Sequence, residues 1–241
     1  DRWCGTMPSM SIHPHDEPDP LALVLVVDSR HHPEGGVAAT VQDLCSAAAD
    51  GLYRTLHSQD PETLRRVREW TDDRIRKIVK HARGKKYREA VESDLPHIVS
   101  RIGSAEITVF APLRPSEYWP GLAHAQVAGL HAERLGTADP AALPVHLNGA
   151  LAMSTGKLVA QLCHAVQQLD WEYPIETATW AASGRGVRAT WDEAYPGAAG
   201  LASDVVDAGY TEIPPDSHTA WILEQDLPRG CLLLRCGLRL N

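Results

Sequence analysis

The stretch LALVLVV (21–27) decides the fold class, because its apolar residues run without interruption and end at Asp28. A run this short is typical of a strand buried on both faces. It is well below the roughly 18 apolar residues that a membrane span needs, and no other window reaches that length. Turn residues (28–36) follow, and then an Ala-rich segment (37–52) that we expect to form a helix. The beginning of the chain therefore predicts a strand–helix unit of an α/β protein.

The same alternation continues along the chain. We predict further helices over 61–92, with a break near Gly84, and over 117–135, 156–169 and 198–207. We predict further strands over 105–111, 145–151, 187–191, 219–223 and 231–235. Strands that alternate with helices favour a sheet covered by helices. The predicted fold is α/β, a three-layer α/β/α arrangement with mixed sheets.

Two segments suggest a tandem duplication, VLVVDSRHHPEGGVAATVQDLCSAAA (24–49) and VHLNGALAMSTGKLVAQLCHAVQQ (145–168). Each contains an expected strand, a loop with Gly, and an Ala-rich helix with a Cys. The alternative is that any two strand–helix units look this similar. We expect a flexible tail (1–20), a first α/β domain (21–140) and a second domain (141–241).

Cysteine and histidine usage gives no sign of a metal centre or a disulfide framework. The five cysteines (4, 45, 163, 231 and 236) are odd in number and form no C-x-x-C pair. We expect a reduced, cytoplasmic protein. A metal site built from His13, His15, His31 and His32 is disfavoured, because the first two lie in the expected tail. We predict no metal and no cofactor.

The segment ALAMSTGKLVAQLCHA (150–165) is the first candidate for chemistry. A strand, a loop of small residues and a helix follow one another, and such a turn directs backbone N–H groups outward. Lys157 adds a charge suited to a phosphate or a developing oxyanion. Ser154 or Thr155 is also a natural helix cap. A nucleotide-binding P-loop is excluded, because Leu158 stands where that motif needs Ser or Thr.

The second candidate is DVVDAGYTEIPPDSHTAWIL (204–223). It places Asp207 at an expected helix end, followed by Gly209 in a turn and by Thr211. A carboxylate beside a lysine in a cleft can position water and stabilise an oxyanion. The hypothesis requires that Asp207 and Lys157 meet in space, which the sequence alone does not show.

Together the two segments resemble the peptidyl-tRNA hydrolase 2 family, whose motifs read roughly M-G-K-G-K, then A-A-Q and H-A, and D-A-G-R-T. The matching residues here are MSTGK (153–157), VAQ (159–161), CHA (163–165) and DAGYT (207–211). Thr155 replaces the first lysine and Tyr210 replaces the arginine. The resemblance covers about 144–236, and the chain is also similar to actinobacterial relatives with a basic segment in front. It implies that the first half is a degenerate copy or a lineage-specific addition.

The resemblance implies hydrolysis of the ester that joins a peptidyl or N-blocked aminoacyl group to tRNA. Lys157 would stabilise negative charge, Asp207 would orient or deprotonate water, and Thr211 would position substrate or water. Further site residues would be Ser154, Thr155, Gln161, His164 and Thr219. A Ser154–His164–Asp207 triad is disfavoured, because nothing in the spacing supports it. The family is often dimeric, so we expect either a homodimer or an internal pseudo-dimer.

A basic block supports an RNA partner. Residues 65–88 contain eleven Lys and Arg against three acids, so this block carries +8 and the rest of the chain −16. Within RIRKIVKHARGKKYR (74–88), a helix would place Arg76, Lys80 and Arg83 on one stripe. Phosphate contacts from such a stripe would be salt-sensitive and independent of sequence. The predicted tRNA contacts are Arg74, Arg76, Lys77, Lys80, Arg83, Lys85 and Lys86. A simple solvated helix face is the alternative.

Two other functions stay open. An amine acceptor in place of water would make the protein a tRNA-dependent transferase or amide ligase. A scaffold without catalysis would make it a tRNA-binding module, which the presence of both Lys157 and Asp207 disfavours.

Overall fold

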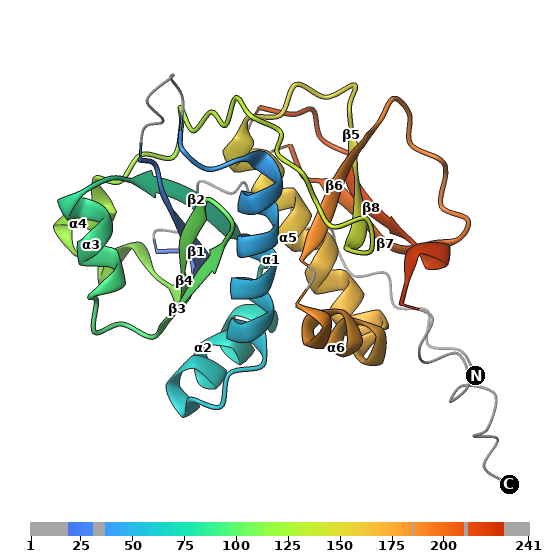
Figure 1. The fold of residues 1–241 in the computed structure, drawn as a ribbon. Coiled ribbons are helices and arrows are strands. Elements are labelled where there is room, and N and C mark those ends of the chain that lie inside the picture. The colour runs from blue at the N-terminus through green and yellow to red at the C-terminus, as the bar shows by residue number, and fades with distance from the viewer. Residues whose placement is uncertain (1–18, 31–36, 185, 210–211, 229–241) are drawn as a thin grey trace, which may run out of the picture.

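The computed structural model describes residues 19–30, 37–184, 186–209 and 212–228, and Figure 1 shows an α/β protein built on two mixed four-stranded sheets. The first half contains β1 (Ala22–Asp28), α1 (Val41–Leu56), α2 (Pro61–Thr71), β2 (Lys77–Ala82), α3 (Lys85–Val91), β3 (His97–Ile102), β4 (Ala105–Leu113), the 3-10 turn η1 (Pro115–Glu117) and α4 (Pro120–Ala123). The second half contains β5 (Leu143–Asn148), α5 (Thr155–Glu172), α6 (Pro174–Ser183), β6 (Val187–Asp192), β7 (Leu201–Asp207), β8 (Ser217–Leu223) and the 3-10 turn η2 (Glu224–Asp226).

The two halves repeat one topology. Their strand orders are β2-β1-β4-β3 and β6-β5-β8-β7. In each sheet the two strands that flank the long helix are parallel, and the remaining pairs are antiparallel. A pair of helices follows the first strand of each half. The agreement extends over whole sheets, and this supports the tandem duplication over a chance likeness of two strand–helix units.

The apolar run at the start of the chain forms a strand that is buried on both faces. Leu23 and Leu25 face the core under α1, whereas Val24 and Val26 pack on the opposite side of the sheet with Leu122 of α4. The first sheet is therefore covered by α1 on one face and by α3 and α4 on the other, which is the α/β/α layering that the sequence predicts.

The two halves share one core. α1 and α5 lie side by side between the sheets (Figure 1) and contact each other. α1 also packs against β6 of the second half, and α5 packs against β2 of the first half. Gln42 and Ser46 of α1 hydrogen-bond the backbone of Ala189 and Val187, respectively, along the free edge of β6. The two halves therefore pack on each other through α1 and α5.

The helix predicted over 61–92 is wrong between Asp72 and Gly84. After α2 the chain enters β2, which pairs parallel with β1 between Lys77 and Ala82, and it becomes helical again only in α3. The local charge pattern suits a helix, but pairing with the fully buried β1 decides the conformation. Since β2 is a strand, Arg76, Lys80 and Arg83 do not form a helical stripe.

Two other predicted helices are wrong. Only Pro120–Ala123 of the segment 117–135 is helical. The segment 198–207 contains β7 instead, which follows the positive-φ Gly197 and Gly200. Asp207 therefore ends a strand and not a helix. The sequence analysis also missed β3 and α6.

The other predicted elements are confirmed with shifted ends. They correspond to β1, α1, β4, β5, α5, β6 and β8. The predicted strand 231–235 and most of the predicted tail lie outside the described residues. Within the part that is described, none of the helices has the length and apolar character of a membrane span.

Candidate functional site

The site begins at the N-terminus of α5, where two hydroxyl residues have structural contacts. Ser154 is the N-cap, and its Oγ accepts a hydrogen bond from the backbone N–H of Lys157 at 3.3 Å. The backbone N–H of Ser154 donates to Glu212 at 2.8 Å. Thr155 Oγ1 accepts from the backbone N–H of Ala132 at 3.1 Å. Both predicted substrate-binding hydroxyls thus fix the start of the helix, as cap residues do.

Lys157 and Asp207 meet. The ammonium of Lys157, in the first turn of α5, donates to Oδ2 of Asp207 at the end of β7, although fifty positions separate them. Their side chains are 13% and 6% exposed. The pair is therefore held at the edge of the core and not in open solvent. Its burial makes the charge–charge contact stronger than a surface ion pair.

Gln161 and Thr219 complete a chain of hydrogen bonds to the carboxylate. Gln161 lies one turn after Lys157 on α5 and donates from Nε2 to Asp207 Oδ2 at 2.6 Å. Thr219 of β8 donates to Gln161 Oε1 at 2.9 Å, with the backbone oxygen of Val205 at 3.1 Å as a second acceptor. These contacts are buried. The carboxylate is thereby oriented from both the helix and the sheet.

The turn after Asp207 holds the other carboxylate oxygen. The backbone N–H of Gly209 donates to Asp207 Oδ1 at 2.8 Å. Gly209 has a φ of 77°, and a Cβ there would come within 2.7 Å of Pro215. Only glycine fits this close turn without strain. Thr211, the third predicted catalytic residue, lies outside the described residues, as does Tyr210.

His164 does not join this cluster. Its Nδ1 lies 2.9 Å from Nζ of Lys77, which comes from the first half of the chain. Burial, together with the charges of Lys77 and Lys157, lowers the pKa of His164 well below its ordinary value. Since Ser154 Oγ is engaged as a cap and His164 contacts Lys77, the structure does not assemble a Ser154–His164–Asp207 triad.

The predicted tRNA-binding residues separate into two groups. Lys77 is largely enclosed between β2 and α5, and Lys80 is buried, where its Nζ donates to the backbone oxygen of Ala125 at 3.3 Å. The predicted phosphate contacts need amines that are exposed along one face of a helix, and neither of these amines is exposed in that way. Arg83, in the turn after β2, and Lys85 and Lys86, at the start of α3, are exposed. Arg74 and Arg76, which precede β2, are partly buried.

The first half has a different pair at the equivalent place. Thr40 caps α1 as Ser154 caps α5, and each cap accepts from the residue three positions later. This equivalence places Asp43 where the second half has Lys157. Asp43 accepts from both the N–H and the hydroxyl of Ser104, at 2.9 and 2.6 Å. The counterpart of the site is thus closed by a neutral donor, which agrees with a degenerate copy.

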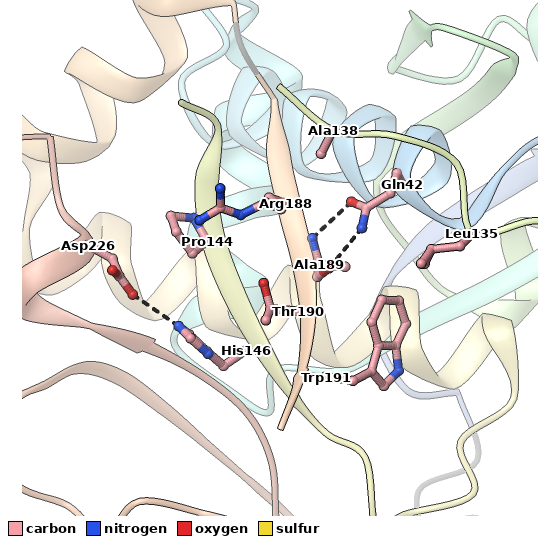
Figure 2. Close-up of a pocket in the computed structure, with 10 residues that line it drawn as sticks. All are labelled: Gln42, Leu135, Ala138, Pro144, His146, Arg188, Ala189, Thr190, Trp191 and Asp226. Atoms are coloured by element: carbon pink, nitrogen blue, oxygen red, sulfur yellow. Dashed lines mark hydrogen bonds and ion pairs between the residues drawn. The ribbon is translucent and has the colours of Figure 1, made fainter. Parts of the chain in front are cut away.

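Three cavities of 350–470 Å³ lie away from the Lys157–Asp207 pair. The largest follows the edge of β6, and Figure 2 shows Gln42 of α1 bonded to Ala189 on one side of it and His146 beside Asp226 on the other. His146 lies between two carboxylates, Asp192 at 2.8 Å and Asp226 at 3.0 Å. None of these three cavities is lined by Lys157, Gln161, Asp207 or Thr219.

One contributor to the site, Glu212, was not predicted from the sequence, and the hydrogen bond from the backbone N–H of the predicted turn residue Gly209 to Asp207 was not predicted either. Glu212 lies five residues after Asp207 in the same segment, but only the fold shows that it accepts from Ser154. The described residues contain no group of three or more His, Cys, Asp or Glu side chains arranged to hold a metal ion. The histidines at 13, 15, 31 and 32 lie outside the described part of the chain.

Comparison with protein-family models, with curated proteins and with solved structures finds no match to this chain.

Proposed function

We propose that the protein hydrolyses the ester bond between a peptidyl or N-blocked aminoacyl group and tRNA, and that it acts in the cytoplasm. The observation that carries the proposal is the convergence of Lys157, Gln161, Asp207 and Thr219 from two segments that lie far apart in the sequence. The same residues are those that the resemblance to the hydrolase family marks.

The chemistry follows from the donors and acceptors of the cluster. Lys157 donates one N–H to Asp207, and among the described residues no other acceptor is seen for it, so its remaining N–H bonds can serve a substrate oxygen that gains negative charge. Asp207 Oδ1 accepts only from Gly209 among the described residues, which leaves a lone pair for a water molecule. A water held by Asp207 beside the ammonium of Lys157 is suited to attack an ester carbonyl.

The position of the site also suits a macromolecular substrate. Lys157 and Asp207 line none of the three cavities of 350–470 Å³, which are the places where a small molecule would be enclosed. A tRNA would provide its own binding area, and the exposed cations Arg83, Lys85 and Lys86 are available for its phosphates.

Steady-state hydrolysis of N-acetyl-aminoacyl-tRNA tests the proposal. We expect Lys157→Met and Asp207→Asn each to lower kcat by about a hundredfold, or ~2.7 kcal/mol of transition-state stabilisation. Asp43→Asn, at the equivalent helix position of the first half, is the matched control and should keep the wild-type rate. A wild-type protein that binds the tRNA without releasing the acyl group would contradict the proposal and favour a binding module.

The acceptor is a separate question. Release of the free N-blocked amino acid as the product, with and without added amines, identifies water as the acceptor. Formation of an amide would instead identify a transferase or ligase.

A further inference from the structure

Lys77 connects the two halves of the protein through a contact with α5. Its Nζ lies 2.9 Å from His164 Nδ1, and it also donates to Oε1 of Gln167. The ring of Trp70 in α2 covers the amine, with its centroid 5.2 Å from Nζ. A lysine of the first half is therefore enclosed against the helix that carries the site in the second half.

The protonation states in this contact are defined by its geometry. Burial lowers the pKa of Lys77 to about 7. His164 stays neutral, as its depressed pKa requires, and its Nδ1 accepts from Lys77, which places the ring proton on Nε2. Gln167 has a buried Nε2 without a partner among the described residues, so Lys77 is the group that fixes its side-chain amide.

The repeated scaffold does not require this lysine. The register of the parallel pairs places Val187 of β6 at the position that Lys77 occupies in β2. At that position the contact is between α1 and β6: Ser46 of α1 hydrogen-bonds the backbone N–H and C=O of Val187. The charged contact is thus confined to α5, the helix that holds Lys157 and Gln161.

His164 follows Lys157 by seven residues, which is two helical turns, and Gln161 lies between them. We propose that Lys77 is a positioning residue for the Lys157–Asp207 site. Through its contacts with His164 and Gln167 it holds α5 in a fixed position against β2. This inference rests on the proposed function for its meaning in catalysis. It gives the first half a role in the reaction, although Asp43 and Ser104 stand there in place of a Lys–Asp pair.

The contact also makes the site sensitive to pH. Above about pH 7 the Lys77 amine is neutral and stays in contact with His164 and Gln167, whereas at lower pH it gains a charge that favours opening to water. Among the described residues, the other titratable groups coupled to this contact are Cys163 and Lys157 on α5, and Cys45 on α1 faces Cys163. Asp207 on β7 is already paired with Lys157. We therefore expect kcat to fall as the pH decreases below 7.

Lys77→Met and Lys80→Met test the inference as a matched pair. Lys80 lies on the same strand, is also buried, and has the Tyr118 ring 5.4 Å from its Nζ, but it donates to Ala125 and not to α5. We expect Lys77→Met to lower kcat by about tenfold with KM within about twofold, and to remove the decrease below pH 7. Lys80→Met should keep both the wild-type kcat and the wild-type pH profile.

Imidazole ¹⁵N spectra give a readout that does not depend on activity. The His164 Nδ1 signal, assigned by its loss in His164→Gln, should shift in Lys77→Met and not in Lys80→Met. Wild-type kcat and pH profile in Lys77→Met, or an equal loss in both variants, would overturn the positioning role.

If the wild type itself does not hydrolyse the ester, the proposed function fails, and the Nζ signal of Lys157 then decides the inference. A shift of that signal in Lys77→Met alone supports positioning of Lys157 by Lys77, and an unchanged signal refutes it.

Discussion

The carboxylate of Asp207 accepts from three donors, and two of them, Lys157 and Gln161, lie one turn apart on α5. The third is the backbone of Gly209, in a turn that tolerates no larger residue. At the scale of single residues, the cluster is therefore oriented before any substrate arrives. Preorganised polar groups of this kind need little rearrangement in a transition state.

A substitution of Thr219 tests whether the orientation of the Asp207 carboxylate matters. Thr219→Val removes the hydroxyl that donates to Gln161 and leaves Oε1 of Gln161 buried without that donor. We expect the free energy of unfolding to fall by about 1–2 kcal/mol and kcat to fall by about tenfold. Urea unfolding and ester hydrolysis measure the two effects.

Thr177→Val provides the comparison for Thr219→Val. Thr177 is also fully buried, but its hydroxyl donates to the backbone of Tyr173 at 2.9 Å, within the turn that starts α6. This variant should lose stability and keep kcat. A similar loss of kcat in both variants would show that the effect of Thr219 is general and not specific to the site.

At the scale of elements, helix side chains cover strand edges that would otherwise stay open. Gln42 of α1 uses both ends of its amide on Ala189 of β6, accepting from the backbone N–H at 2.9 Å and donating to the backbone oxygen at 2.8 Å. The amide thus replaces a neighbouring strand and joins the halves. An uncovered edge of this kind is a template for aggregation.

Gln42→Leu is expected to lower the free energy of unfolding by about 2–3 kcal/mol, because it leaves a buried N–H and a buried C=O of Ala189 without partners. Urea unfolding measures the change. Gln59→Leu, at an exposed position beyond α1, should be nearly neutral. Equal stability of the two variants would show that Ala189 finds other partners when the amide is absent.

At the scale of the whole molecule, charge is distributed unevenly. The chain carries −8 overall, yet the turn after β2 and the start of α3 expose Arg83, Lys85 and Lys86. Lys80 is buried below them. Reversal of its charge would therefore disturb the fold and would not test RNA binding. The surface available to phosphates is smaller than the sequence pattern suggests, and it belongs to the first half.

Arg83→Glu combined with Lys86→Glu is expected to weaken tRNA binding strongly and to lower the salt dependence of log Kd by about 2 units of slope. Filter binding at several salt concentrations measures both values. Arg68→Glu, on the exposed side of α2, is the control and should have a weaker effect. If the double variant binds tRNA as the wild type does, the RNA contacts lie elsewhere.

The sequence by itself determined the α/β class, suggested the duplicated strand–helix unit, and named Lys157, Gln161, Asp207 and Thr219 as candidates for one site. These features depend on local patterns: the buried run 21–27, the caps and the glycine turn after Asp207 each specify their own conformation. Tertiary structure alone decided that 77–82 is a strand and that 201–207 is a strand. Pairing with β1 and β8 determines both conformations, because a strand gains its hydrogen bonds from distant residues. The enclosure of Lys77 against α5 has the same origin, since burial of a charge depends on what packs over it and not on its neighbours in the chain.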